Sequence, residues 1–287
     1  MKRLDRSEII FKVIAYTFVT LFAICCLYPF IYTLSAALSS YDAMKEGKVI
    51  LFPVEFQTEA FKYVFEQRQF WISYSNTIFY TLYGTAWSML ISILGAYALS
   101  KRKLLFNRQF NFLLVFTMWF SAGMVPTYIN YIRLGVDNRW GIVIAMGVQA
   151  YNVILLRNAF SSVSKEIEDA AVIDGANELQ ILTNVHMPMS KAAIATVTLF
   201  YGLSRWNGYF WTRMLLKKSE EQPLQVYLRI QLERLEDLEA TGSMLIEYSK
   251  ESMMYAMLIC AIIPIIIVYP YLQKYFARGV NLGGVKE

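Results

Sequence analysis

Long apolar stretches alternate with shorter polar segments along this chain of 287 residues. A transmembrane helix needs about 20 mostly apolar residues, because each residue rises about 1.5 Å through about 30 Å of hydrocarbon. Backbone groups in lipid must bond internally, so each such stretch is expected to be helical. The predicted fold class is therefore all-α, a polytopic membrane protein with six transmembrane helices. The six predicted spans lie at about 13–40, 70–100, 109–132, 141–160, 192–212 and 252–273.

The charges of the connecting segments predict how these spans are oriented. Lys and Arg are enriched in the segments that stay in the cytosol. The segments 1–12, 101–108 and 274–287 are rich in Lys and Arg, whereas 42–68 holds four basic and five acidic residues. Six crossings with both termini in the cytosol satisfy this pattern. We therefore expect a cytosolic N-terminus at 1–12, a single transmembrane domain at 13–273 and a cytosolic tail at 274–287.

The connection 161–191 runs against this charge bias. The predicted topology makes it cytosolic, yet it carries two lysines against five acidic residues, which are Glu166, Glu168, Asp169, Asp174 and Glu178. A cytosolic loop that opposes the Lys and Arg bias is expected to have a functional reason for its acids.

Local residue preferences predict two short helices within this loop. Ser164 can cap the first, because a side-chain oxygen accepts from the free N–H groups of a helix start, and nearby acids suit the positive end of the helix dipole. Asp174-Gly175 then breaks the helix, since glycine readily adopts positive φ. The second helix is expected from Ala176 to about residue 185, and Pro188 is expected to end it.

Composition supports the membrane assignment and excludes several classes of function. The chain is 17% charged and 56% hydrophobic, whereas a soluble protein carries roughly a quarter charged residues. A net charge of +5 makes nucleic acid a poor partner. The three cysteines all lie in apolar stretches and give no disulfide frame or zinc spacing.

No set of catalytic residues is present in the sequence. The chain has one histidine, His186, and we expect it to be an ordinary surface residue of the loop. With one histidine in the chain, a Ser/His/Asp arrangement is not plausible. No G-x-x-x-x-G-K-[ST] motif occurs, so no phosphate-binding loop is expected in this chain. The chain is therefore predicted to be neither an enzyme nor a metalloprotein.

The loop and three further segments resemble a known family. The stretch DAAVIDGANE (169–178) has an acid followed by two alanines, a glycine four residues later and a proline-containing exit. It is similar to the "EAA" coupling loop of the membrane subunits of binding-protein-dependent ABC importers. The carbohydrate subgroup, and the maltose-type inner permease within it, is resembled by LYPFIYTLSAALSS (27–40), RWNGYFW (205–211) and QKYFARGVNLGGVKE (273–287). Departures from the family pattern are Asp169 for the usual Glu, His186-Met187-Pro188, and Ala192.

The resemblance implies that 161–191 is a coupling-helix loop that docks on a separate ATPase, with its small face in a cleft and its acids against basic residues. The residues implied in this coupling are Glu168, Asp169, Ala170, Ala171, Asp174, Gly175, Ala176 and Pro188. It also implies that ATP and Mg are bound by the partner ATPase and that this chain binds no cofactor. The implied partners are a sister permease, two ATPase subunits, an extracytoplasmic solute-binding protein and an oligosaccharide, in a bacterial cytoplasmic membrane.

Polar and aromatic residues in the spans are candidates for lining a substrate path. A charge at the bilayer centre costs about 2.5–3.5 kcal/mol, so Arg205 either snorkels to the outer headgroups or contacts an acidic sugar in the path. The aromatic cluster that follows it is either a sugar platform or an aromatic belt. Lipid-facing amides would lack partners, which favours the amides of the fourth span as path residues. The candidates are Gln149, Asn152, Arg205, Trp206, Asn207 and Tyr209.

Two alternative functions stay open at this point. The loop suits a permease for peptides or amino acids equally well, and only the three further segments favour sugar. A secondary transporter is the other alternative, but it predicts intramembrane acids and internal repeats. No Asp or Glu lies within a predicted span, and no repeat of fixed period is present.

Overall fold

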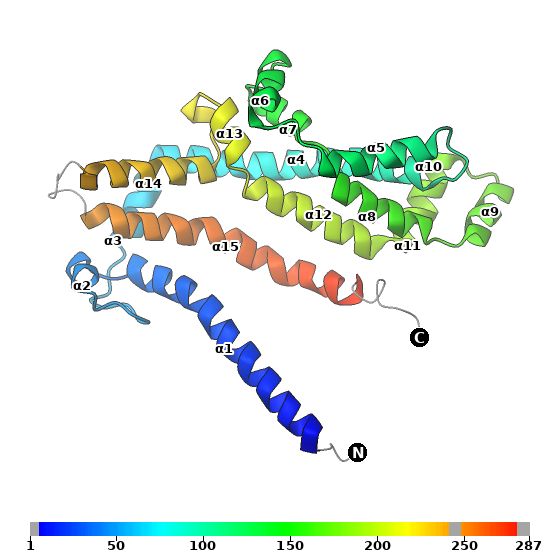
Figure 1. Cartoon of the computed structure of the whole chain (residues 1–287). Helices are drawn as coiled ribbons and strands as arrows, with labels where there is room; N and C mark the ends of the chain where they lie inside the picture. The colour runs from blue at the N-terminus through cyan, green and yellow to red at the C-terminus, as the bar shows by residue number, and fades with distance from the viewer. Residues whose placement is uncertain (1–5, 241–247, 280–287) are drawn as a thin grey trace. The chain divides into compact units, whose positions relative to one another are not determined.

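The computed structural model describes residues 6–240 and 248–279, and its regular secondary structure within these ranges is entirely helical (Figure 1). The charged residues Lys2, Arg3 and Lys286 and the end of the tail motif (280–287) lie outside the described residues. The first half of the chain forms α1 (Arg6–Ala37), α2 (Tyr41–Lys45), α3 (Glu59–Glu66), α4 (Arg68–Ser100), α5 (Asn107–Trp119), α6 (Met124–Arg133) and α7 (Arg139–Ala145). The second half forms α8 (Ala150–Ser161), α9 (Lys165–Ile173), α10 (Glu178–Ile181), α11 (Met187–Met189), α12 (Lys191–Trp206), α13 (Phe210–Leu215), α14 (Leu224–Ala240) and α15 (Tyr248–Gly279).

Three of the described helices are long and apolar enough to cross a membrane unaided. They are α1, α4 and the Glu251–Pro270 stretch of α15. Two bent helix pairs, α5 with α6 and α7 with α8, also pass if each pair counts as one span, which brings the number to five. Helix α12 has 16 residues and falls short of a full crossing by itself. The chain is thus an all-helical polytopic membrane protein, and the sixth crossing stays a prediction.

The expected continuous helix at 109–132 is wrong. Helices α5 and α6 meet at an angle of 118°, and the chain turns at Gly123, whose φ is +86°. A side chain at this φ would be strained, so glycine permits the turn. Pro126 lies in the first turn of α6, where its missing N–H removes no helical bond. The apolar composition continues across this break, which is why hydropathy alone does not show it.

The expected helices at 141–160 and 192–212 are also interrupted. Helix α7 ends at Ala145, and α8 resumes at Ala150 with a bend of 49°. Helix α12 ends at Trp206, and α13 begins at Phe210, with three residues between them. A Cβ atom on Gly147 would lie 2.9 Å from the Trp87 Nε1 atom, so the first break brings the backbone close to α4.

The chain divides into two compact units, one of 1–68 with 228–264 and the other of 69–227 with 265–287. In the first unit the end of α1 holds the segment that follows α2. The Ser35 hydroxyl donates to the Leu51 carbonyl at 2.7 Å, and the Val54 N–H donates to the Ser39 hydroxyl at 3.0 Å. Tyr32 meets Tyr255 edge to face, with ring centroids 6.0 Å apart.

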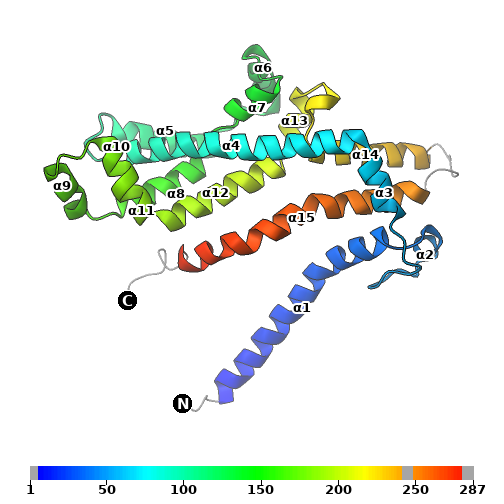
Figure 2. The ribbon, with the colours of Figure 1, turned by 180° about the vertical axis from the view of Figure 1, so that it is seen from behind.

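The second unit contains the loop of interest. Figures 1 and 2 show α8 beside α12, with α5 along α8, while α9 and α10 gather at the end of the unit where α4 terminates. One buried cluster joins these helices and consists of Met89, Ala96, Tyr97, Val153, Leu156, Phe160, Ile181, Leu182, Val197 and Tyr201. The Ser92 and Tyr201 hydroxyls are 2.6 Å apart inside it, so the polar atoms of α4 and α12 pair with each other. This cluster is the floor on which the loop rests.

Candidate functional site

The loop at 161–191 has the two helices and the glycine bend that its sequence predicts. Helix α9 stops at Ile173, and Gly175 adopts a φ of +81°. The N–H of Ala176 donates to the Ala171 carbonyl at 3.0 Å, which closes the end of α9. A backbone hydrogen bond therefore closes the chain at the bend.

The ends of these two helices differ in detail from the prediction. Helix α10 starts at Glu178 and not at Ala176, because Asn177 caps it: the Gln180 N–H donates to the Asn177 side chain at 2.9 Å, and the Asn177 N–H donates back to the Gln180 side chain at 2.9 Å. Ser164 precedes α9 as expected, but its hydroxyl donates to the Glu166 carboxylate. Within the fully described helix α9, this hydroxyl accepts no hydrogen bond from a backbone N–H.

The expectation that Pro188 ends the second helix is wrong. Helix α10 passes into a π-turn at Leu182–His186 and then into α11, which contains Pro188. A proline ring clashes with the carbonyl four residues earlier in a regular helix. The wider turn, in which the Met187 N–H donates to the Leu182 carbonyl, relieves that crowding. The loop therefore reaches α12 as a nearly continuous helical segment.

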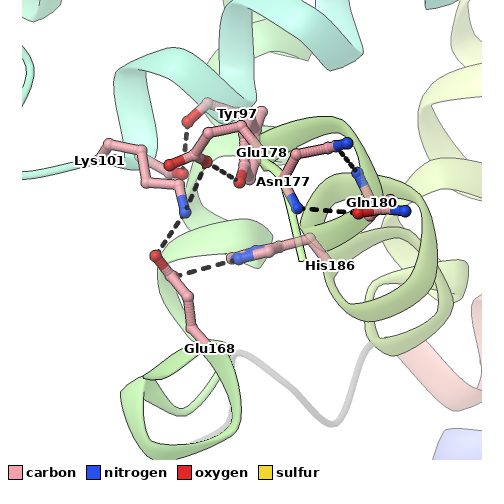
Figure 3. Close-up of polar contacts among 8 residues, drawn as sticks. Tyr97, Lys101, Glu168, Asn177, Glu178, Gln180 and His186 are labelled. Carbon is pink, nitrogen blue, oxygen red and sulfur yellow. Dashed lines mark hydrogen bonds and ion pairs between the residues drawn. The ribbon is translucent and has the colours of Figure 1, made fainter. Parts of the chain in front are cut away.

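A polar network ties the loop to the end of α4 (Figure 3). The Lys101 ammonium, one residue beyond α4, lies 2.5 Å from Glu168 of α9 and 3.5 Å from Glu178 of α10. The Tyr97 hydroxyl donates to Glu178 at 2.5 Å. His186 Nε2 lies 3.3 Å from the second oxygen of Glu168. Side chains from α4, α9, α10 and the π-turn thus meet at one point.

His186 is buried, so the expectation of a surface histidine is wrong. Only 2% of the residue is exposed, and its ring packs edge to face on Tyr97 and Phe160 with centroids 5.1 and 5.9 Å away. Burial lowers the pKa of His186, and the Lys101 ammonium lowers it further. A neutral imidazole can donate its Nε2–H to Glu168, so His186 acts as a hydrogen-bond partner inside the loop.

Lys101 and Glu168 each stabilise the charged form of the other. Burial by itself would raise the pKa of Glu168, but the bond and the charge of Lys101, with His186, hold that pKa below its usual value. Burial would lower the pKa of Lys101, but its bonds to Glu168 and Tyr97 raise it overall. Glu168 and Lys101 are therefore charged together across the neutral range.

The sequence-predicted coupling residues divide into two groups. Ala171 and Ala176 pack against the buried cluster of the same unit, and Glu168 is paired to Lys101. The exposed members are Asp169, Ala170, Asp174, Gly175 and Pro188. The small face formed by Ala171 and Ala176 thus serves the fold of the loop, and Glu168 already has a partner in its own chain.

The exposed surface of the loop contains apolar residues that the sequence interpretation did not single out. Ile173 is 86% exposed, Leu179 is 64% exposed, and Val172 is 55% exposed. They flank the glycine bend on the ends of α9 and α10. Large apolar side chains this exposed on an otherwise polar loop are typical of a surface that a partner covers. Their position beside Asp-Gly was the signal that could have identified them.

Arg205 is buried beside α7. Its guanidinium donates to the carbonyls of Ile142 (3.2 Å), Val143 (3.3 Å) and Met146, and to the Ser88 hydroxyl (3.1 Å). These carbonyls lie at the C-terminal end of α7, and a cation suits the negative end of a helix dipole. The residue is 8% exposed, so it does not snorkel to the headgroups.

The other path candidates do not form one site. Gln149 donates to the Ser204 hydroxyl at 2.9 Å, and Asn152, which is 1% exposed, donates to Gln149 at 3.1 Å. These two amides therefore belong together, between α8 and α12. Trp206 is buried and packs edge to face on Tyr74. Asn207 is exposed and Tyr209 half-buried beyond the end of α12.

Comparison with known proteins finds matches over almost the whole length of this chain. Residues 10–282 match the family described as binding-protein-dependent transport system inner membrane component. The chain is 36% identical over 282 residues to the polygalacturonan/rhamnogalacturonan transport system permease protein YtcP of Bacillus subtilis (strain 168), covering 96% of this chain and 98% of that protein.

Solved structures show the same similarity. A chain of a bacterial ABC transporter involved in the import of the acidic polysaccharide alginate is 46% identical, with a TM-score of 0.88 over 96% of this chain and 100% of that chain. A chain from a bacterial alginate ABC transporter in complex with an alginate pentasaccharide-bound periplasmic protein is 14% identical, with a TM-score of 0.57 over 98% of both chains. The second match shows the fold alone.

Proposed function

This chain belongs to the family of binding-protein-dependent transport system inner membrane components, and on that premise we propose that it forms half of the translocation path for an acidic oligosaccharide. It is the non-catalytic permease subunit of a carbohydrate ABC importer and a multi-pass inner membrane protein. Two relatives support the acidic class: one carries the name of polygalacturonan, a polymer of sugar acids, and the other imports alginate.

The proposed topology has six spans, with both termini and the loop 161–191 in the cytosol of a bacterium. The two bent pairs count as the third and fourth spans, and α12 is the fifth, at about 24 Å for its 16 residues. The basic segment 101–108 precedes α5 on the cytosolic side, and the polar network places Lys101 of that segment against the loop. Both features support one common side for the two segments.

The loop is proposed to dock on a separate ATPase that binds ATP and Mg, within a complex of a sister permease, two ATPase subunits and a solute-binding protein. The observation that carries this proposal is the exposed apolar surface of Ile173, Leu179 and Val172 beside Asp169 and Asp174. Full burial of one such aliphatic side chain stabilises a contact by about 1.5–3 kcal/mol. Burial of these three side chains by a partner would therefore favour docking.

Substitution of Ile173 tests the docking proposal in the assembled complex. Ile173→Asp is expected to abolish co-purification of the ATPase and sugar uptake, because the docking surface would have to bury a new charge. Leu105→Asp is the matched control, because Leu105 is 79% exposed and lies in the other cytosolic connection. Wild-type co-purification and uptake in the Ile173 variant would show that the ATPase binds elsewhere.

The substrate class is tested by competition in proteoliposomes that contain the complex and its binding protein. Unlabelled oligogalacturonates or oligomeric alginate should suppress uptake of a labelled acidic oligosaccharide, and neutral maltooligosaccharides should not. Equal suppression by the neutral sugars would contradict an acidic substrate while leaving the docking result untouched.

A further inference from the structure

The loop is bonded to α4, a helix to which it is not directly connected in the chain. Its neighbours in sequence are α8 and α12, and any movement of the loop reaches them through the backbone. Lys101 and Tyr97 add a third attachment, because they bind Glu168 and Glu178 on both sides of the glycine bend (Figure 3). One cation thus holds α9 and α10 in a fixed relation to the end of α4.

This attachment is held in place from the α4 side. The ammonium of Lys101 lies 4.4 Å from the centroid of the Tyr97 ring, which favours a cation over its face. The side chain of Asn107 donates to the Lys101 carbonyl at 2.9 Å and to the Leu99 carbonyl at 3.0 Å, which fixes the turn after the helix. The lysine therefore has little freedom to follow the loop independently of α4.

The attachment is also shielded from water. The side chain of Lys101 is 20% exposed and that of Glu168 is 28% exposed, whereas Glu178 is 73% exposed. His186 closes the inner side of Glu168. A partly buried ion pair is screened less by salt than a surface pair. The Lys101–Glu168 pair is therefore the principal bond, and Glu178 is the outer one.

We propose that Lys101 is a positioning residue for coupling, which makes α4 move with the loop when the ATPases close. The proposal rests on the docking function proposed above. It goes beyond that function by adding α4 to α8 and α12 as a third helix that moves with the loop. Rigid elements that are packed and bonded together transmit a movement, whereas a loop free of α4 would move α8 and α12 alone. Loss of the pair should then reduce coupling while ATPase binding persists.

Charge reversal and its compensation test this proposal in the reconstituted complex. Lys101→Glu is expected to lower sugar uptake and binding-protein-stimulated ATP hydrolysis about tenfold, within the usual range of coupling between sites, with normal co-purification of the ATPase. Glu168→Lys should behave in the same way. The double variant K101E/E168K should restore uptake to within about threefold of the wild type, because the pair is rebuilt with reversed charges.

Lys103→Glu is the matched control, since Lys103 is exposed two residues further along the same segment. It should leave uptake unchanged. Wild-type uptake in Lys101→Glu, or failure of the double variant to recover while both single variants accumulate normally, overturns the proposal. Loss of ATPase co-purification in Lys101→Glu would also overturn it, because Lys101 would then act in docking.

A milder variant keeps the test decisive if Lys101→Glu fails to accumulate in the membrane. Tyr97→Phe retains the ring and removes the hydroxyl that donates to Glu178. It should raise the number of ATP molecules hydrolysed per sugar imported, and that ratio should rise further with added salt as the remaining ion pair is screened. An unchanged ratio in both conditions contradicts the proposed role of the network.

Discussion

Replacement of Arg205 separates a structural cation from a residue that contacts the substrate. Its guanidinium supplies donors to three carbonyls at the end of α7 and to Ser88. Glutamine is shorter and offers two donors from one nitrogen, so Arg205→Gln loses at least one of the three bonds to these carbonyls. Loss of the bond to one buried acceptor costs about 1–3 kcal/mol, which predicts a loss of about 1–3 kcal/mol in the free energy of unfolding.

The assay combines thermal unfolding of the purified complex with uptake of an acidic and a neutral oligosaccharide. The bonds of Arg205 end on protein carbonyls, so Arg205→Gln should destabilise the permease and lower any measurable uptake by the same factor for both sugars. Arg133→Gln is the control, because Arg133 is exposed at the end of α6 and should change stability by no more than about 0.5 kcal/mol. Unchanged stability with loss of acidic uptake alone would refute the structural role.

Gly84 gives a second route to the same bonds without removing the charge. A Cβ atom on Gly84 of α4 would lie 2.8 Å from Arg205 Nε, so Gly84→Ala should displace the guanidinium and reproduce the instability. Gly95 lies in the same helix, and a Cβ atom there meets nothing within 4 Å. Gly95→Ala should therefore leave the complex as stable as the wild type or slightly more so. Equal effects of the two variants would contradict the reasoning.

Two further predictions concern the loop. Gly175→Ala should cost about 1–2 kcal/mol of backbone strain and lower coupled uptake; Gly135→Ala, at a φ of +69° with equally open surroundings, carries the same strain outside the loop and should not affect coupling, so equal uptake in the two variants would contradict the prediction. The second is a pH dependence of thermal stability. Burial and the Lys101 charge lower the pKa of His186 below its ordinary 6.5. The contribution of neutral His186 to folding stability is therefore fully present above about pH 6.5, and it is lost as the pH falls through the pKa of His186 in the folded protein. The pKa of Glu168 is likewise lowered, so its contribution is lost only at more acidic pH, and that of Lys101 is raised above 10.5, so its contribution is lost only above that value. In His186→Gln, the melting temperature should fall less than in the wild type as the pH is lowered from about 7. An equal fall in the variant and the wild type would show that His186 is not the cause.

Hydropathy and glycine chemistry predicted much of this chain because both act locally. The spans at α1, α4 and α15 appear as long charge-free runs, and the bend at Gly175 follows from a residue that tolerates positive φ. The breaks at Gly123 and after Ala145 were missed because apolar composition continues across them. Hydropathy reports the environment of a segment and carries no information on the direction of its axis.

The ion pair was beyond local reasoning for a different reason. Lys101 and Glu168 are 67 positions apart in sequence, and local patterns assign their charges separate roles, one as a topology signal and the other as a contact for the ATPase. The burial of His186 depends on Tyr97 and Phe160 from two other helices. Such contacts arise only when the helices pack, so a single sequence does not reveal them.

Helix α4 is linked both to the break between α7 and α8 and to the loop at 161–191. Arg205 closes the end of α7 and packs on Gly84, while Lys101 secures α9 and α10. Gly84 in α4 and Lys101, which directly follows α4, are 17 residues apart, or about 25 Å along the helix axis. Because α4 is continuous from Gly84 to its C-terminal end, a displacement of that end by the loop is carried to the level of the α7 break. The break between α7 and α8, which Gln149 and Asn152 follow in the chain, is therefore where a movement of the loop carried along α4 would arrive.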